Sequence, residues 1–385
     1  MDVLSRAQAL EAAGRSVIHM EIGEPDFTAP APVVAAAVRA LHDGRSAYTA
    51  TLGLPTLREA IAAHYSSSFS KEVEPGSIAV TAGASGGLLL VLALYVNPGD
   101  EILVPDPGYP GYRHMVRAFE GVARPLKLSP ASNFQPTLEM VRAAWGPRTR
   151  GLLLGSPSNP TGTIIAEKEI KKIARFVASR RGVLIVDEIY QGLVYGHPPA
   201  TALGLPGEVV IVNSFSKYFC MTGWRLGWVA LPRRRMREFE KLAQHLFICA
   251  PAIAQHAALA CFAPATLKIL ERRRREFCRR RDFLVPALEQ AGLRVPAKPG
   301  GAFYVYAACQ GDGRRFALDG KRFALQLLER EGVAATPGID FGSNRTQRYV
   351  RFAYTRAMAD LEEAAGRLKR FCGGPVRPPQ RVGVA

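Results

Sequence analysis

Short apolar runs alternate with longer amphipathic stretches through the middle of the chain. Stretches with the helical spacing of apolar residues lie at Leu57–His64, Leu88–Val96 and Glu167–Arg180. The apolar runs have the length of buried strands, and they lie at Ile78–Thr81, Glu101–Pro105, Ala123–Leu128, Gly151–Leu154, Val183–Asp187, Val209–Ser214 and Leu226–Ala230. Strands that alternate with helices predict an α/β fold with a largely parallel central sheet. The last two strands lack a clear helix between them, so we expect an antiparallel edge pairing there.

The pattern changes after Pro251. A long helical stretch, Ala265–Gln290, is followed by strand-like runs at Ala302–Tyr306 and Tyr349–Ala353. We therefore expect a large domain and a smaller α+β domain, with the large domain at residues 28–285 and the small one formed by residues 1–27 and 286–372. Residues 373–385 are rich in proline and glycine, which predicts a disordered tail.

The chain of 385 residues carries a formal net charge of +17, with arginine runs at 233–235, 272–275 and 279–281. A basic surface of this kind is one feature of proteins that bind nucleic acid. The last two runs, however, lie in the long helical stretch, whose inward face is supplied by Leu267, Leu270, Phe277, Phe283 and Leu284. No zinc-finger, RNA-binding or basic-zipper pattern accompanies them. We therefore favour a solvated helix face and expect no nucleic-acid partner.

Membrane and metal proteins are also disfavoured by the sequence. No apolar run approaches the length that spans a bilayer. The segment Met1–Gly14 lacks the layout of a secretory signal, so we expect a cytoplasmic location and no membrane partner. The six cysteines are scattered, without metal-ligand spacing, which predicts reduced thiols and no metal site.

The segment Asn213–Lys217 and the following Met221–Gly227 contain the strongest chemical signal. Lys217 lies in an apolar, aromatic neighbourhood, where desolvation lowers an amine pKa and leaves a nucleophile able to attack a carbonyl. Nearby hydroxyls and an arginine suit a phosphate. A carbonyl compound that carries a phosphate describes pyridoxal phosphate. The segment also fits the S-x-x-K pattern of serine acyl enzymes, but the chain lacks their S-D-N and K-T-G elements.

Polar residues follow several of the predicted strands, where open α/β sheets form their sites. The small residues of Thr81–Gly87 open a helix and suit a phosphate, whereas Tyr109 could stack on a planar ring. Asn159 lies near prolines, and Asp187 ends an apolar strand, where it could pair with a pyridinium nitrogen. Arg351 lies in an apolar strand and could clamp a carboxylate. Taken singly, these residues also fit plain turns, a cap, core aromatics or an internal ion pair.

Several short motifs occur in a fixed order along the chain, from about Val17 to Leu368. In that order the chain resembles the class I aminotransferases of fold type I, which depend on pyridoxal 5'-phosphate. The resemblance implies a mixed, mostly parallel seven-stranded sheet between helices and a smaller α+β domain. The motifs are Gly23–Phe27, Tyr48-Thr49, Ser158–Gly162, Asp187–Tyr190, Ser216-Lys217 and Gly223–Gly227.

The resemblance also implies a role for each candidate residue. Lys217 would bind the cofactor and move the substrate proton, and Asp187 would pair with the pyridinium nitrogen. Asn159 and Tyr190 would hydrogen-bond the ring hydroxyl, and Tyr109 would stack on the ring. The resemblance implies that Arg351, near Gly23 and Asn159, would bind the substrate carboxylate. It implies that the phosphate would be bound by Ser214, Ser216, Arg225, the backbone of Gly83, Ala84 and Ser85, and Tyr48 of a neighbouring subunit.

The implied activity is a transamination of the EC 2.6.1 type between an L-amino acid and a 2-oxo acid, with ping-pong kinetics, in a homodimer with shared sites. A C–S β-lyase on the same scaffold is the alternative. A third interpretation, a DNA-binding regulator with a winged-helix domain in front, lacks room for that domain. The donor stays open between aspartate, aromatic and aliphatic amino acids. Ala84 stands where many relatives carry serine or threonine, and the phosphate-loop region offers no lysine for a second carboxylate.

Overall fold

The computed structural model describes residues 2–196, 198–309 and 319–373, and its largest element is a seven-stranded sheet. The strand order is β2-β8-β7-β6-β5-β3-β4, and neighbouring strands run parallel except around β8, which is antiparallel to both β2 and β7. This confirms the expected mixed, mostly parallel sheet. The strands are β2 Ile78–Thr81, β3 Glu101–Asp106, β4 Val122–Lys127, β5 Thr149–Gly155, β6 Val183–Asp187, β7 Glu208–Ser214 and β8 Gly227–Ala230.

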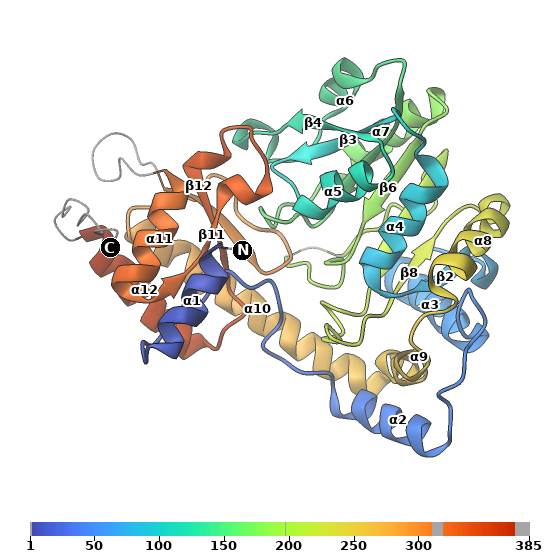
Figure 1. Cartoon of the computed structure of the whole chain (residues 1–385), viewed down its shortest axis with the longest axis horizontal. Helices are drawn as coiled ribbons and strands as arrows, with labels where there is room; N and C mark the ends of the chain where they lie inside the picture. The colour runs from blue at the N-terminus through green and yellow to red at the C-terminus, as the bar shows by residue number, and fades with distance from the viewer. Residues whose placement is uncertain (1, 197, 310–318, 374–385) are drawn as a thin grey trace, which may run out of the picture.

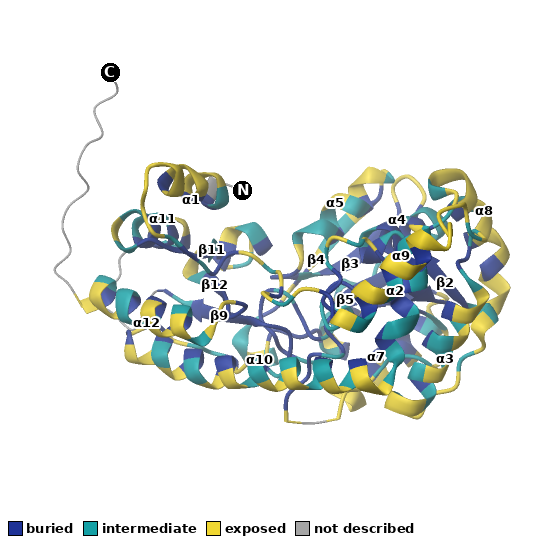
Figure 2. Cartoon of the chain, turned by 90° about the horizontal axis from the view of Figure 1, so that it is seen from below, coloured by how far each residue is buried: buried dark blue, intermediate teal, exposed yellow. Residues whose placement is uncertain are grey.

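Helices cover both faces of this sheet. Side chains alternate between the faces along a strand, so Leu152 and Leu154 of β5 pack with α3, α6 and α7, whereas Leu153 packs with α4, α5 and α8. Because both faces are covered, the strands are mostly buried and read as apolar runs, except the edge strand β4, whose residues are mostly exposed or half-buried (Figure 2). The helices are α3 Pro55–Phe69, α4 Gly83–Tyr95, α5 Pro110–Ala118, α6 Leu138–Ala144, α7 Glu167–Ser179 and α8 Met236–Phe247.

A smaller α+β region lies at one end of the molecule. The long helix α10, Pro264–Gln290, runs from the neighbourhood of α9 to the smaller sheet (Figure 1). That antiparallel sheet has the order β11-β12-β9, and β1 pairs with β10 in parallel beside it. The elements are α1 Asp2–Ala12, β1 Ile18–His19, β9 Tyr304–Ala308, α11 Gly320–Glu331, β10 Val333–Ala334, β11 Thr336–Pro337, β12 Tyr349–Ala353 and α12 Met358–Gly373.

The remaining elements are two helices and several 3-10 helices. Helix α2, Ala31–His42, packs on α9, Ala252–Ala258. Among the described residues no single helix is long and apolar enough to cross a bilayer. The helix pair Ala252–Phe262 and Pro264–Gln290, which is bent by 84°, would be long and apolar enough if its two parts are counted together, by length and composition alone. The 3-10 helices are η1 Pro75–Ser77, η2 Pro130–Ser132, η3 Arg233–Arg235, η4 Leu259–Phe262, η5 Gly338–Phe341 and η6 Thr346–Arg348.

Three expectations need correction. Strand β8 lies inside the sheet, since β2 pairs along its other side, so the antiparallel pairing is correct but the edge position is wrong. The strand expected at Ala302–Tyr306 begins at Tyr304, because Ala302 has a left-handed backbone, with φ at 56°. Two arginines of the long helix are buried rather than solvated: Arg280 pairs with Asp26 at 2.8 Å and Arg281 is 8% exposed.

The expected domain boundaries stay a prediction. Gly373 ends α12, and the rest of the expected disordered tail lies outside the described residues.

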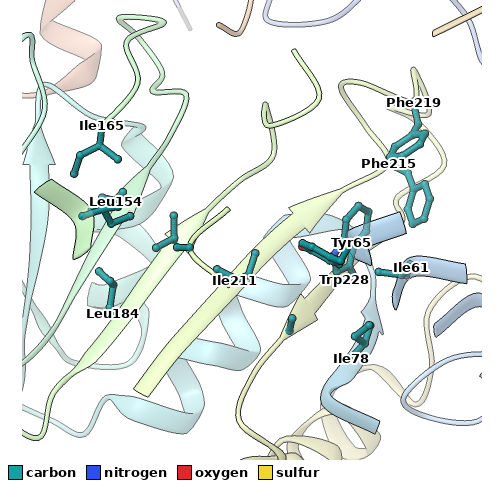
Figure 3. Close-up of a cluster of buried hydrophobic side chains, with 14 of the residues drawn as sticks. Ile61, Tyr65, Ile78, Leu154, Ile165, Leu184, Ile211, Phe215, Phe219 and Trp228 are labelled. Atoms are coloured by element: carbon teal, nitrogen blue, oxygen red, sulfur yellow. The ribbon is translucent and has the colours of Figure 1, made fainter. Parts of the chain in front are cut away.

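An aromatic cluster supports the loop between β7 and β8 (Figure 3). Phe215 and Phe219 are buried against Trp228, whose indole N–H donates to the Tyr65 hydroxyl at 3.1 Å. Phe215 and Phe219 flank Lys217 in the sequence, and because both rings are buried, the loop holds the lysine in a fixed position. The fold therefore anchors the residue that the sequence singles out.

Candidate active site

A cavity of about 360 Å³ lies where β6 and β7 end and α4 begins. Binding sites of open α/β sheets form at these carboxyl ends of strands. The cavity brings together most of the candidate residues, namely Gly23, Ala84, Ser85, Tyr109, Asn159, Asp187, Tyr190, Ser214, Ser216, Lys217, Arg225 and Arg351.

Lys217 presents its amine to this cavity. Its Nζ donates a hydrogen bond to the Gly23 carbonyl oxygen at 2.6 Å and lies 5.9 Å from the centre of the Phe303 ring. Burial lowers the pKa of the amine from its ordinary 10.5 to about 8. A useful fraction of the amine is therefore unprotonated near neutral pH, as a nucleophile or a general base requires.

Asp187 lies across the cavity at the end of β6 and is 5% exposed. Its carboxylate accepts hydrogen bonds from the Tyr112 hydroxyl at 2.8 Å and from the Ile189 backbone N–H at 3.1 Å. Within the described part of the chain, no lysine or arginine forms an ion pair with it. Burial raises the pKa of Asp187 to about 6. Such a carboxylate would gain from a cationic N–H donor in the cavity.

The opposite end of the cavity is suited to an anion. Helix α4 begins at Gly83, where φ is 72° and a Cβ atom would lie 2.7 Å from Nη2 of Arg225. Glycine therefore lets the guanidinium approach the first turn, whose backbone N–H groups have no partner within the helix. The Ser214 hydroxyl donates to the Ser216 hydroxyl at 2.9 Å, and Arg225 donates to the Thr222 carbonyl oxygen at 2.9 Å. Hydroxyls, a guanidinium and a helix N-terminus together match a phosphate.

Two buried tyrosines line the cavity where it meets the smaller sheet, and one of them, Tyr304, begins β9. The hydroxyls of Tyr190 and Tyr304 are 2.8 Å apart, and burial raises the pKa of both above 10. A Cβ atom on Gly23 would lie 2.1 Å from the Tyr304 hydroxyl, so this position needs glycine. Both phenols stay protonated at neutral pH, and since one hydroxyl donates to the other, the second is left to donate into the cavity.

Arg351 of β12 is buried between the rings of Tyr304 and Phe341, with its guanidinium carbon 4.3 and 4.9 Å from their centres. Its Nη1 donates to Asn159 Oδ1 at 3.0 Å, and its Nη2 donates to the Glu21 carbonyl oxygen at 2.5 Å. Its buried Nε has no hydrogen-bond partner among the described residues. A guanidinium held by neutral groups, with donor capacity left over, is suited to a ligand carboxylate.

Two candidates lie outside the cavity wall. Gly83 is adjacent to it, as its contact with Arg225 shows. Tyr48 is 80% exposed and is not brought into the cavity of its own chain. The Tyr109 ring lines the cavity and meets the Tyr112 ring edge to face, with centroids 5.3 Å apart.

Sequence reasoning missed several residues of the cavity. Tyr304 follows the Gly300-Gly301 pair and lies in an expected strand. The sequence did not indicate that its hydroxyl faces the site, because the turn at Ala302 changes where that strand begins. Tyr112 lies in the same tyrosine-rich turn as Tyr109, and the signal for it was present. Its hydroxyl binds Asp187 instead of a ligand ring. The other missed lining residues are Leu88, Pro157, Ile189 and Thr222.

Comparison with known proteins gives a consistent result. The model of the family "Aminotransferase class I and II" matches residues 15–368. A valine–pyruvate aminotransferase of Mycobacterium tuberculosis is 38% identical over 370 residues, which cover 96% of this chain and 94% of the relative. The aspartate aminotransferase of Geobacillus stearothermophilus is 34% identical over 379 residues, which cover 96% and 94% of the two chains.

Solved structures agree with these relatives. An aminotransferase from Mycobacterium tuberculosis superposes with a TM-score of 0.92 at 37% identity and covers 97% of this chain and 96% of its own. The aspartate aminotransferase from Thermus thermophilus with maleate gives a TM-score of 0.89 at 34% identity, with coverage of 96% and 95%.

Proposed function

The chain belongs to the class I and II aminotransferases, and on this basis we propose that it moves the amino group of an L-amino acid to a 2-oxo acid through Lys217. Proteins of the aspartate aminotransferase type in this family use pyridoxal phosphate, and the relatives reported above are all named aminotransferases. The β-lyase alternative has no support among them. One observation carries the proposal: a buried amine of lowered pKa faces a buried carboxylate and a spare guanidinium across one cavity.

The cavity fits pyridoxal phosphate at each of its polar ends. Asp187 is a buried carboxylate without a cationic partner among the described residues, and a pyridinium N–H would supply one. Gly83 leaves room for Arg225 beside the first turn of α4, where Ser214 and Ser216 add hydroxyls for a phosphate. We assign Asn159 and Tyr190 to the ring hydroxyl and Tyr109 to the ring face.

Bound pyridoxal phosphate supplies an aldehyde that condenses with amines and a ring that stabilises negative charge at the substrate Cα. The side chains of this protein supply the rest. Arg351, with Asn159, holds the substrate α-carboxylate and so fixes which bond of Cα faces Lys217. The Lys217 amine would take the Cα proton of the donor in the first half-reaction and would deliver a proton to Cα of the acceptor in the second. Asp187 keeps the ring nitrogen protonated, because its charge is buried and poorly compensated otherwise.

The same features support ping-pong kinetics. Arg351 is the cation assigned to the α-carboxylate, so amino acid and 2-oxo acid would occupy the same place in turn. The first product leaves before the second substrate enters.

A homodimer with shared sites is also part of the proposal. Helix α2 leaves Val34, Val38 and Leu41 exposed at helical spacing, which forms an apolar strip. Tyr48, four-fifths exposed, follows this helix and would reach the cofactor phosphate of the neighbouring subunit. Light scattering after size exclusion should give twice the chain mass, and Leu41→Glu should reduce it. A wild-type monomer at micromolar concentration would contradict the dimer. The cytoplasmic location stays a prediction.

The spectrum of the purified holoenzyme tests the function directly. An amino acid should abolish the visible absorption of the bound cofactor, and a 2-oxo acid added afterwards should restore it. Lys217→Ala should show neither change. Release of ammonia without a 2-oxo acid, or a spectrum that no amino acid alters, would contradict transamination. The names of relatives, which include valine–pyruvate and aspartate exchange, leave the donor open.

A further inference from the structure

A second cavity, of about 320 Å³, lies beside the first one. The two share Tyr109, Asn159 and Arg351 in their walls. An amino acid whose carboxylate lies on Arg351 could therefore direct its side chain into the second cavity. This step rests on the proposed function, because it takes Arg351 as the residue that holds the α-carboxylate.

The wall of the second cavity is mostly apolar. Val3 and Leu4 of α1 line it together with Ile22 and Phe341. Val3 is buried, and it belongs to a small apolar cluster that packs α1 on Leu328 of α11. The apolar side of α1 is thus held in place over the cavity by packing.

The charged groups in this wall are unfavourable to an anion. Glu21 and Asp340 line the cavity, and within the described residues Arg351 is the cation there. Arg351 already donates to the Asn159 oxygen at 3.0 Å and to the Thr336 hydroxyl at 3.1 Å. Once a substrate α-carboxylate occupies its remaining capacity, a second carboxylate would be buried beside like charges, with no further cation among the described residues that line the cavity.

Glu21 has a particular position among these groups. Its Oε1 lies 2.7 Å from His19 Nδ1, and its buried Oε2 has no hydrogen-bond partner in the part of the chain that the structure describes. Nε2 of His19 in turn lies 3.0 Å from Glu11 Oε1 on α1. Burial lowers the pKa of His19, but the hydrogen bonds to Glu21 and Glu11 raise it more, so the net pKa is above the ordinary value. His19 therefore holds one oxygen of Glu21, while the other is buried in the wall, so the carboxylate places negative charge beside the cavity.

We propose that this second cavity receives the donor side chain and selects amino acids with uncharged, mainly apolar side chains over aspartate and glutamate. Val3 and Leu4 supply the apolar contact. Glu21 excludes a second carboxylate and is the specificity-determining residue. The assignment covers both half-reactions, since the 2-oxo acid uses the same cavity.

A panel of donors tests the proposal with wild-type holoenzyme. The rate at which each amino acid abolishes the cofactor absorption is measured for valine, leucine and phenylalanine and for aspartate and glutamate. The apolar donors should exceed the acidic ones in kcat/KM by at least about tenfold, which corresponds to about 1.4 kcal/mol. Aspartate or glutamate reacting equally well would overturn the proposal and leave the proposed transamination intact. If no donor reacts, both fall.

A binding measurement tests the assignment of the second cavity without requiring the enzyme to turn over. Isovalerate and succinate carry no amino or keto group, so they bind without reacting. Isothermal titration should give a lower Kd for isovalerate than for succinate. Tighter binding of succinate would overturn the assignment of the cavity.

The substitution Glu21→Gln isolates the role of the carboxylate. Glutamine keeps the backbone oxygen that Arg351 uses and an oxygen for His19, and it can turn an amide N–H toward the cavity. The ratio of kcat/KM for aspartate to that for valine should rise about tenfold, the size of one hydrogen bond exchanged for a repulsion. Glu11→Gln, which alters only the outer partner of His19, is the matched control and should leave the ratio unchanged. An unchanged ratio in Glu21→Gln would refute the role of Glu21.

Discussion

Replacing Asp187 by asparagine should make the apoprotein more stable while it disables the enzyme. Asp187 is buried at the end of β6, and burial raises its pKa from the ordinary 3.8 to about 6. At pH 8 the carboxylate is ionised in both the folded and the unfolded chain, so folding has to bury a charge. The difference between the two pKa values corresponds to about 3 kcal/mol.

The sign of the pH dependence follows from the direction of the shift. Because the folded pKa is raised, the folded chain binds the proton more tightly than the unfolded chain between about pH 4 and pH 6. Wild-type apoprotein therefore loses stability as the pH rises through this window, whereas the asparagine variant has no such term. The stability of the variant relative to wild type should therefore rise through this window and level off above pH 7.

Weaker hydrogen bonding in the asparagine variant offsets part of this gain in stability. Asp187 accepts from the Tyr112 hydroxyl and from the Ile189 N–H, and an amide has one oxygen for these two donors. Tyr112 can reverse its role and accept from the amide, so we subtract about 1 kcal/mol. The net stabilisation expected for Asp187→Asn at pH 8 is about 2 kcal/mol.

Urea unfolding of apoprotein at fixed protein concentration, from pH 5 to pH 8, measures this difference. Addition of pyridoxal phosphate should then stabilise wild type more than Asp187→Asn, because only the carboxylate pairs with the ring nitrogen. An asparagine variant less stable than wild type at pH 8, or one that gains as much from the cofactor, would refute the reasoning. Asp106→Asn, a buried carboxylate outside the cavity that binds Ser343, controls for general effects of amide substitution.

Three other side chains of the cavity give testable predictions. The rate of cofactor uptake by apoprotein, measured by stopped-flow absorbance, should rise about tenfold per pH unit below pH 8 and level off above it. The reason is that the Lys217 pKa is lowered to about 8 and only the free amine reacts. Arg351→Lys should raise KM for the amino donor about 10- to 100-fold with a smaller change in kcat, since a charged hydrogen bond is lost. Tyr304→Phe keeps the ring over Arg351 but loses the hydroxyl at Tyr190, so kcat should fall about 3- to 10-fold with little change in donor KM.

Contrary results are equally informative for these three predictions. A pH-independent uptake rate would mean that another group limits the reaction. An unchanged KM in Arg351→Lys would remove Arg351 from the carboxylate site. An unchanged kcat in Tyr304→Phe would make Tyr304 a packing residue alone.

The sequence predicts those parts of the fold and site that local order determines. Apolar runs of strand length give β2 and β6 with their observed ends, because strands covered on both faces are continuous in apolar residues. Asp187 ends β6 and Lys217 lies three residues after the end of β7, at the edge of the sheet where ligands bind. Their meeting in one cavity is therefore foreseeable from strand positions and chemistry.

What the sequence does not predict depends on contacts between distant segments. The place of β8 inside the sheet is set by its pairing with β2, far away in the chain. The burial of Arg280 is set by Asp26 and by the ring of Phe27, which no spacing within α10 reveals. Glu21 becomes a cavity residue only because α1 packs beside it, and the Tyr304 hydroxyl enters the site only because the chain turns at Ala302.

The central claim is that Lys217 carries the cofactor in this cavity. Holoenzyme treated with borohydride, which fixes the cofactor to its lysine, can be digested and mapped by mass spectrometry. The account predicts one modified peptide, with the added mass on Lys217, and loss of that modification when an amino donor is added before the reductant. Modification of a different lysine, or none, would contradict the assignment of this site.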